Sequence, residues 1–166
     1  MSWTFNGIPA HPLLVHAVVV LVPLAAVAAL AVVLWPAARR WLGIGMPILV
    51  SAAAASTALA KEAGEWLEER VDESAALERH TEGADMLVPW IIAFFLLAWG
   101  YWAWRRFGGN ADAGPSTRAK VITIVLGALL AATAVVSTVE VFIVGDAGAQ
   151  AVWSDQGDWT GAGDEG

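Results

Sequence analysis

The chain has 166 residues, of which 58% are hydrophobic and only 15% are charged, and its mean hydropathy of +0.61 is that of a membrane protein rather than a soluble domain. The net charge of −7 argues against nucleic-acid binding, because contacts to phosphates need clustered Lys and Arg. The absence of cysteine excludes disulfides, thiolate-bound zinc, thiolate-ligated iron–sulfur clusters and covalently attached haem.

The first apolar segment, residues 12–35, is long enough to cross a bilayer, since a hydrocarbon core of roughly 30 Å needs about 20 helical residues. It opens with His11-Pro12-Leu-Leu-Val-His16, so two of the three histidines stand at its start. The first basic residue is Arg39, and the basic region that opens a cleavable signal peptide is therefore missing. We expect a permanent first span that ends at a basic turn.

A second span is predicted over residues 41–60, and its later half consists almost entirely of small residues. Small residues let helices approach closely, so this half is expected to pack against neighbouring helices. Residues 61–83 carry eight acidic and three basic residues, with apolar side chains recurring at helical spacing. This pattern predicts an extra amphipathic helix that leaves the membrane and folds over the mouth of the bundle.

A third span is predicted over residues 84–104, where closely spaced tryptophans followed by two arginines are typical of an aromatic belt at the membrane surface. A turn-rich connection leads to a fourth span over residues 119–144. Residues 154–166 are acidic and rich in glycine, which predicts a disordered tail. The expected fold is all-α, with a four-helix transmembrane domain over residues 1–153 that includes the extra helix over 61–83.

The basic residues set the expected orientation. Three of them, spread through an acidic excess, lie between the second and third spans. Six follow the first and third spans: Arg39, Arg40, Arg105, Arg106, Arg118 and Lys120. Since Lys and Arg are enriched in cytoplasmic loops, both termini and the acidic segment are expected on the extracytoplasmic side of a bacterial inner (plasma) membrane.

This topology gathers polar side chains at the outer ends of the helices. His16 lies just over one turn inside the first span, Glu140 lies at a similar depth in the fourth, and His80 precedes the third by one turn. An ionisable residue inside a membrane is costly and tends to have a partner, so we expect Glu140 to pair with His16. His11 and Asp146 are expected to form the layer above them.

Three interpretations of this cluster remain open from the residues alone. The first is a structural network that ties helix ends together. The second is a site for Zn, Cu, Fe or Mn, all of which accept His and carboxylate ligands, built from His11, His16, His80, Glu140 and Asp146. The third is b-type haem held between His16 and His80, since four-helix bundles build cofactor sites from facing helices.

Geometry ranks the metal ion above haem, because His16 and His80 differ in depth. Residues five apart on a helix point about 140° apart, so His11 and His16 share an ion only if His11 lies off the helix, which Pro12 favours. Proton transport is disfavoured, because no polar residue continues from Glu140 toward the cytoplasm.

The motif Gly7-Ile-Pro-Ala-His11-Pro12-Leu-Leu-Val-His16 resembles the N-terminal signature of DUF2231, a family of uncharacterised bacterial four-span membrane proteins. His80 and the segment Val144-Gly-Asp146-Ala-Gly148-Ala-Gln-Ala-Val-Trp153 are similar to the family's other recurring features. Related domains are joined to Rieske or cytochrome c modules, so the resemblance implies electron transfer at the outer face. It thereby favours haem or a metal at His11, His16 and His80. Relatives with histidine in place of Asp146 imply one fewer nitrogen ligand here.

The sequence therefore predicts a non-catalytic module of the lipid bilayer whose outer cluster binds a metal ion or b-type haem and accompanies a redox system. Its expected partner is an electron-transfer protein or another membrane protein, and oligomerisation stays open. The alternative is a structural or assembly subunit of a larger membrane complex, without a cofactor. No nucleophile–base pair and no phosphate-binding loop is recognisable, so the residues give no reason to expect an enzyme.

Overall fold

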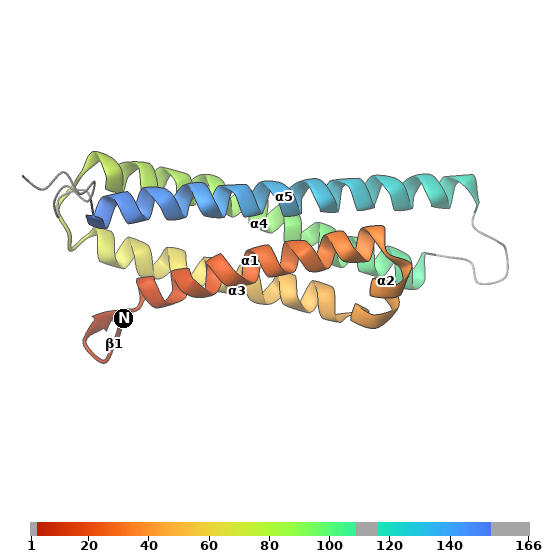
Figure 1. Ribbon diagram of the computed structural model, residues 1–166, viewed down its shortest axis with the longest axis horizontal. Coiled ribbons are helices and arrows are strands. Elements are labelled where there is room, and N and C mark those ends of the chain that lie inside the picture. The colour runs from red at the N-terminus through yellow and green to blue at the C-terminus, as the bar shows by residue number, and fades with distance from the viewer. Residues whose placement is uncertain (1–2, 109–115, 154–166) are drawn as a thin grey trace, which may run out of the picture.

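The computed structural model describes residues 3–108 and 116–153, which form five helices and one short β-hairpin. The predicted tail over 154–166 lies outside the described residues. The hairpin pairs β1 (Thr4–Phe5) with β2 (Ile8–Pro9). The helices are α1 (His11–Leu34), α2 (Pro36–Leu42), α3 (Gly45–Glu68), α4 (Ala75–Phe107) and α5 (Thr117–Trp153) (Figure 1).

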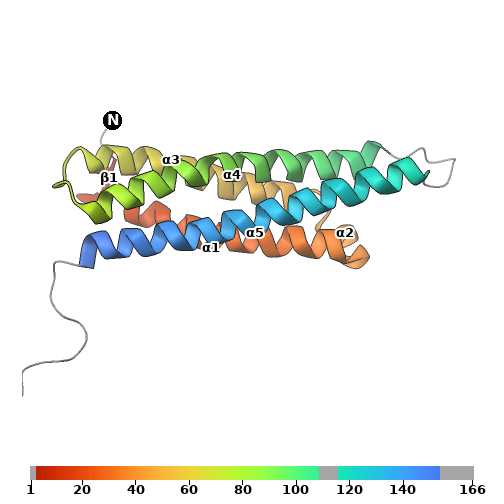
Figure 2. The same ribbon diagram turned by 90° about the horizontal axis from the view of Figure 1, so that it is seen from above.

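The four long helices lie side by side as an up-and-down bundle (Figures 1 and 2). α1 packs against α3 and α5, and α4 packs against the same two helices. α1 and α4 are therefore diagonal partners, and both start at the same end. Alanines together with branched and aromatic side chains fill the centre, where Val22, Phe94 and Leu130 are completely buried.

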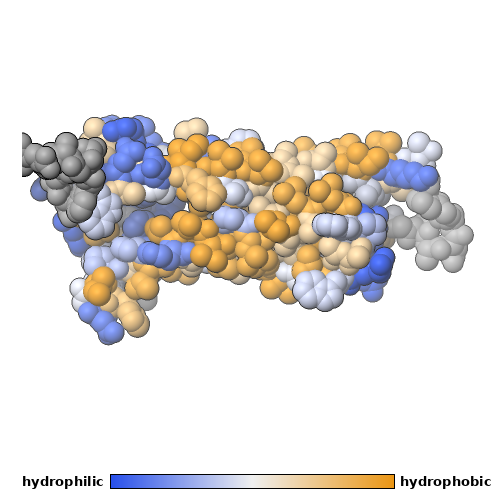
Figure 3. Space-filling view, viewed as in Figure 1, coloured by the Kyte–Doolittle hydropathy of each residue, from blue (hydrophilic) through white to orange (hydrophobic). Residues whose placement is uncertain are grey.

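The two ends of the bundle differ in their polar residues. We call the end with His11 and His80, near the starts of α1 and α4, the histidine end. The opposite end, with Arg39 of α2 and Arg105 of α4, is the arginine end. Between the two ends the surface is largely apolar, as the orange band in Figure 3 shows. Such a band is what a membrane-spanning protein presents to lipid.

Three helices, α1, α4 and α5, are long and apolar enough to cross a membrane. α2 and α3 give a fourth candidate if the pair forms one span, with a bend of 70° between the two helices. The predicted continuous second span over 41–60 is thus interrupted. Gly43 has a positive φ of 48°, which ends α2, and α3 begins at Gly45.

The expected separate helix over 61–83 is not confirmed. α3 continues to Glu68 because, apart from Gly64, residues 61–68 are mostly good helix formers, and Lys61 bonds Glu65 one turn away. The chain leaves α3 after Glu68, and Ser74 caps α4 by accepting a hydrogen bond from the Leu77 N–H at 3.1 Å. The acidic residues therefore divide between the end of α3, the connection over 69–74 and the start of α4.

The hairpin before α1 turns at Asn6 and Gly7, whose φ angles are both positive, at 50° and 81°. Asn-Gly is the preferred pair for this tight turn, because both central residues must adopt left-handed backbone. The turn brings Phe5 opposite Ile8, and both side chains are exposed. The hairpin thus carries apolar side chains at the histidine end.

Candidate functional site

His11 and His80 meet at the histidine end, one from each of the diagonal helices. Their ring centroids lie 5.9 Å apart with an interplanar angle of 83°, which is an edge-to-face arrangement. Both side chains are half-buried. The pair forms because α1 begins at His11 and α4 begins one turn and a half before His80, at the same end of the bundle.

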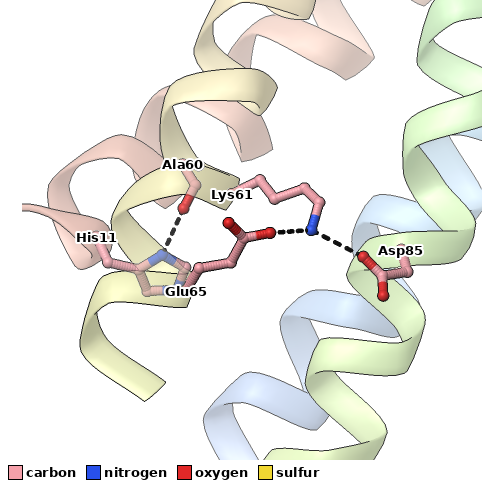
Figure 4. A network of polar contacts seen from close by, with 5 residues as sticks. All are labelled: His11, Ala60, Lys61, Glu65 and Asp85. Carbon is pink, nitrogen blue, oxygen red and sulfur yellow. Dashed lines mark hydrogen bonds and ion pairs between the residues drawn. The ribbon is translucent and has the colours of Figure 1, made fainter. Parts of the chain in front are cut away.

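Each imidazole is fixed by a carbonyl group of a neighbouring helix. His11 Nδ1 donates to Ala60 O of α3 at 2.8 Å (Figure 4), and His80 Nδ1 donates to Val144 O of α5 at 2.9 Å. A carbonyl oxygen can only accept, so both Nδ1 atoms carry a hydrogen. In the neutral ring the lone pair then lies on Nε2. We call the two rings and these two carbonyl groups the histidine clasp.

Each ring of the clasp also lies against a glycine four residues beyond the carbonyl that it binds. A Cβ atom at Gly64 would lie 3.0 Å from both Cε1 and Nδ1 of His11. A Cβ atom at Gly148 would lie 2.9 Å from the same two atoms of His80. At Gly148 a side chain would therefore force the His80 ring or the helix to shift, and at Gly64 the His11 ring would have to give by a few tenths of an ångström.

Sequence reasoning assigned no packing role to either glycine, although both end the same short triplet. Gly64 ends the triplet Glu62-Ala63-Gly64, and Gly148 ends Asp146-Ala147-Gly148. The same acidic-Ala-Gly pattern also occurs at Asp112-Ala113-Gly114, outside the described residues, so the pattern alone does not identify the positions where a histidine packs.

A small cavity of about 60 Å³ lies beside the clasp, between side chains of all four long helices. Apart from His11 and His80 themselves, its lining is apolar except for Thr57 and Lys61. Lys61 Nζ forms an ion pair with Asp85 Oδ1 of α4 at 2.8 Å and a second one with Glu65 of its own helix (Figure 4). Among the described residues, Lys61 is the only Lys or Arg that lines this cavity, and two carboxylates pair with it.

The other three predicted site residues do not join the clasp. His16 is exposed, and its Nδ1 donates to Pro12 O of the same helix at 2.6 Å. Because His11 faces inward, a residue five positions later points about 140° away. Glu140 is half-buried on α5, and no described ion pair or hydrogen bond links it to His16. Asp146 is exposed and accepts a bond from Gln150 Nε2 at 2.8 Å.

These positions do not fit the predicted cofactors. Within residues 3–108 and 116–153, no group of three or more His, Asp or Glu side chains is placed to hold a metal ion. The five-residue metal site is therefore not supported. Haem between His16 and His80 is not supported either, because His16 points away. The cavity beside His11 and His80 has room for a few water molecules rather than a porphyrin.

The fold and the polar ends define an α-helical, polytopic membrane protein. The chain matches the family model described as "Predicted membrane protein (DUF2231)" over residues 7–160, so it belongs to the DUF2231 family. The resemblance carried by the motif from Gly7 to His16 is thereby confirmed. The match covers both rings of the clasp and both glycines. Neither a curated protein nor a solved structure shows significant similarity to the chain.

Proposed function

We propose that this DUF2231 protein is a non-catalytic structural or assembly subunit of the bacterial inner membrane, with four spans. α1, α4 and α5 each cross once, and α2 with α3 crosses as a bent fourth span. The basic residues at the arginine end favour a cytoplasmic location for that end. Both chain termini and the histidine clasp are then extracytoplasmic, and residues 1–153 form one domain.

One observation carries this proposal: the polar groups at the histidine end are used to join helices. The clasp links α1 to α3 through His11 and α4 to α5 through His80, and the two rings link the diagonal helices. The ion pair of Lys61 with Asp85 links α3 to α4. A structural network consists of such bonds between helices, whereas a metal site needs several ligand atoms directed at one point.

The exposed face of α3 supports a role in assembly. Ala52, Ala55 and Ala58 are exposed along one side of this helix, while Ala53 and Ala60 are buried on the other. A surface of small residues allows a transmembrane helix of another protein to approach closely. The electron-transfer partner implied by the family resemblance is one candidate for that protein.

The test compares wild type with His11→Ala and His80→Ala, each purified in mild detergent. Each substitution removes one bond between helices and one ring contact, so we expect the free energy of unfolding to fall by about 1–3 kcal/mol. His16→Ala is the matched control, because it removes an exposed imidazole bonded only within its own helix. We expect it to change stability by less than about 0.5 kcal/mol.

Elemental analysis and oxidised and reduced visible spectra are recorded on the same samples. We expect them not to differ between wild type and the clasp variants. A stoichiometric metal, or a Soret band that shifts on reduction, would overturn the structural assignment if either is lost in His11→Ala or His80→Ala. That result would restore a cofactor to the histidine end.

A further inference from the structure

A second cavity, of about 350 Å³, lies at the arginine end, opposite the histidine clasp. It spans the bend between α2 and α3, since Pro36, Gly43 and Met46 all line it, and Trp102 of α4 forms part of another wall. Its volume falls within the roughly 300–1,000 Å³ of small-molecule sites. It is thus much larger than the cavity beside the clasp.

Four arginines line this cavity: Arg39 and Arg40 of α2, and Arg105 and Arg106 of α4. None of them forms an ion pair with a carboxylate of residues 3–108 or 116–153. All carboxylates in those ranges lie between positions 62 and 85 or at Glu140 and Asp146, toward the histidine end. The cavity therefore concentrates positive charge without a described counter-charge, which favours an anionic ligand.

Arg39 is held against the cavity wall instead of extending into solvent. Its Nη1 donates to Tyr101 Oη of α4 at 3.2 Å, and Tyr101 is only 2% exposed. The bond restrains the position of this guanidinium, whose remaining N–H groups form the planar fork that matches phosphate oxygens.

Arg118 and Lys120 provide the contrast. Both are exposed near the start of α5, at the same end of the bundle, but neither lines the cavity. Basic residues that only set the orientation of a membrane protein need to lie on the same side of the membrane, but they need not line the same cavity. The four arginines line a single cavity from two helices, so orientation alone does not account for their placement.

We propose that this cavity binds a phosphate group, carried either by the headgroup of an anionic phospholipid in the adjoining leaflet or by a soluble phosphate compound. The arginines supply charge-assisted hydrogen bonds to the phosphate oxygens. Trp102 and Tyr101 are of the types enriched at the level of lipid headgroups, where basic pockets between helices bind anionic lipids. This site does not depend on the role of the histidine clasp.

The test measures binding by the full-length protein in a zwitterionic detergent. The lipid arm uses native mass spectrometry with added phosphatidylglycerol or phosphatidylcholine, and the soluble arm uses calorimetric titration with inorganic phosphate. We expect wild type to prefer phosphatidylglycerol to phosphatidylcholine, or to bind inorganic phosphate. In the double variant Arg39→Gln, Arg105→Gln we expect that binding to weaken by at least about tenfold, which corresponds to about 1.4 kcal/mol.

The matched control is Arg118→Gln, Lys120→Gln, which removes two charges from the same end outside the cavity. We expect its binding to equal that of wild type. If loss of the bond to Tyr101 prevents folding of the first variant, Arg40→Gln, Arg106→Gln tests the same cavity through two exposed arginines.

The two arms identify the source of the phosphate group. A preference for phosphatidylglycerol that inorganic phosphate does not compete away assigns the site to a lipid headgroup, and calorimetric binding of inorganic phosphate assigns it to a soluble compound. The proposal is overturned if neither probe binds, or if the cavity variants bind like wild type. Equal weakening in the control would also overturn it, because diffuse surface charge would then explain the binding.

Discussion

Replacing Gly148 by alanine tests how closely the His80 ring is seated on α5. The new Cβ atom would lie 2.9 Å from Cε1 and Nδ1 of His80, a distance at which one of the two groups must move. The His80 ring cannot move freely, because its Nδ1–H donates to Val144 O at 2.9 Å, and Val144 lies on α5 one turn before Gly148. Either the hydrogen bond breaks or α4 and α5 move apart.

The expected cost follows from three contributions. Overpacking costs about 1–3 kcal/mol. The weakened hydrogen bond adds about 1 kcal/mol. Alanine recovers about 1 kcal/mol over glycine inside a helix. We therefore expect Gly148→Ala to lower the free energy of unfolding by about 1–3 kcal/mol, which for a chain of this size lowers the unfolding temperature by roughly 2–12 °C.

The assay is thermal unfolding in mild detergent followed by circular dichroism, with Gly145→Ala as the matched control. A Cβ atom at Gly145, one turn earlier in α5, meets nothing within 4 Å, so this variant should be as stable as wild type or more so. In a His80→Ala background Gly148→Ala should no longer destabilise, because the ring that it meets is gone. Equal losses with and without the His80 ring would refute the reasoning.

Two further predictions concern other polar contacts. Ser137 Oγ on α5 is fully buried and has no hydrogen-bond partner in the described chain, so Ser137→Ala should keep or raise stability by up to about 1 kcal/mol. Thr133→Val, which removes a hydroxyl bonded to Leu129 O, is its control and should lower stability; a clear loss in Ser137→Ala would contradict the assignment. Asp85→Asn removes the charge that pairs with Lys61 at a largely exposed position. In chemical denaturation we expect the free energy of unfolding to fall by less than about 1 kcal/mol, and we expect this decrease to be smaller in high salt. A larger loss that persists in salt would show that this ion pair holds α3 to α4 more strongly than its exposure implies.

Hydropathy locates the long helices well but not their full lengths. The predicted span over 12–35 corresponds to α1, and the spans over 84–104 and 119–144 lie inside α4 and α5. The helices extend past the apolar segments because backbone hydrogen bonding also holds polar residues in a helix. α4, for example, begins at its cap Ser74, well before the apolar segment starts. Apolar length therefore measures what fits a membrane, not where a helix stops.

The sequence placed the histidines at one end of the bundle but did not show which residue of the first motif faces inward. His11 and His16 point about 140° apart on one helix, so a single rotation of α1 decides between them. That rotation depends on how residues such as Val18 and Val22 pack against α3 and α5, for which no local signal exists. The roles of Gly64 and Gly148 became visible only with the bonds of His11 to Ala60 and of His80 to Val144, because the same triplet also occurs at residues 112–114.

The helix pairs α1 with α3 and α4 with α5 place their histidines, arginines and glycines in the same order along the bundle axis. Each half begins near a histidine, turns near a pair of arginines and returns to the glycine that receives its own ring. Both halves run in the same direction, as in parallel rather than inverted repeats. His11 and His80 consequently meet where the halves join, so a change at their contact reaches both halves of the protein at once.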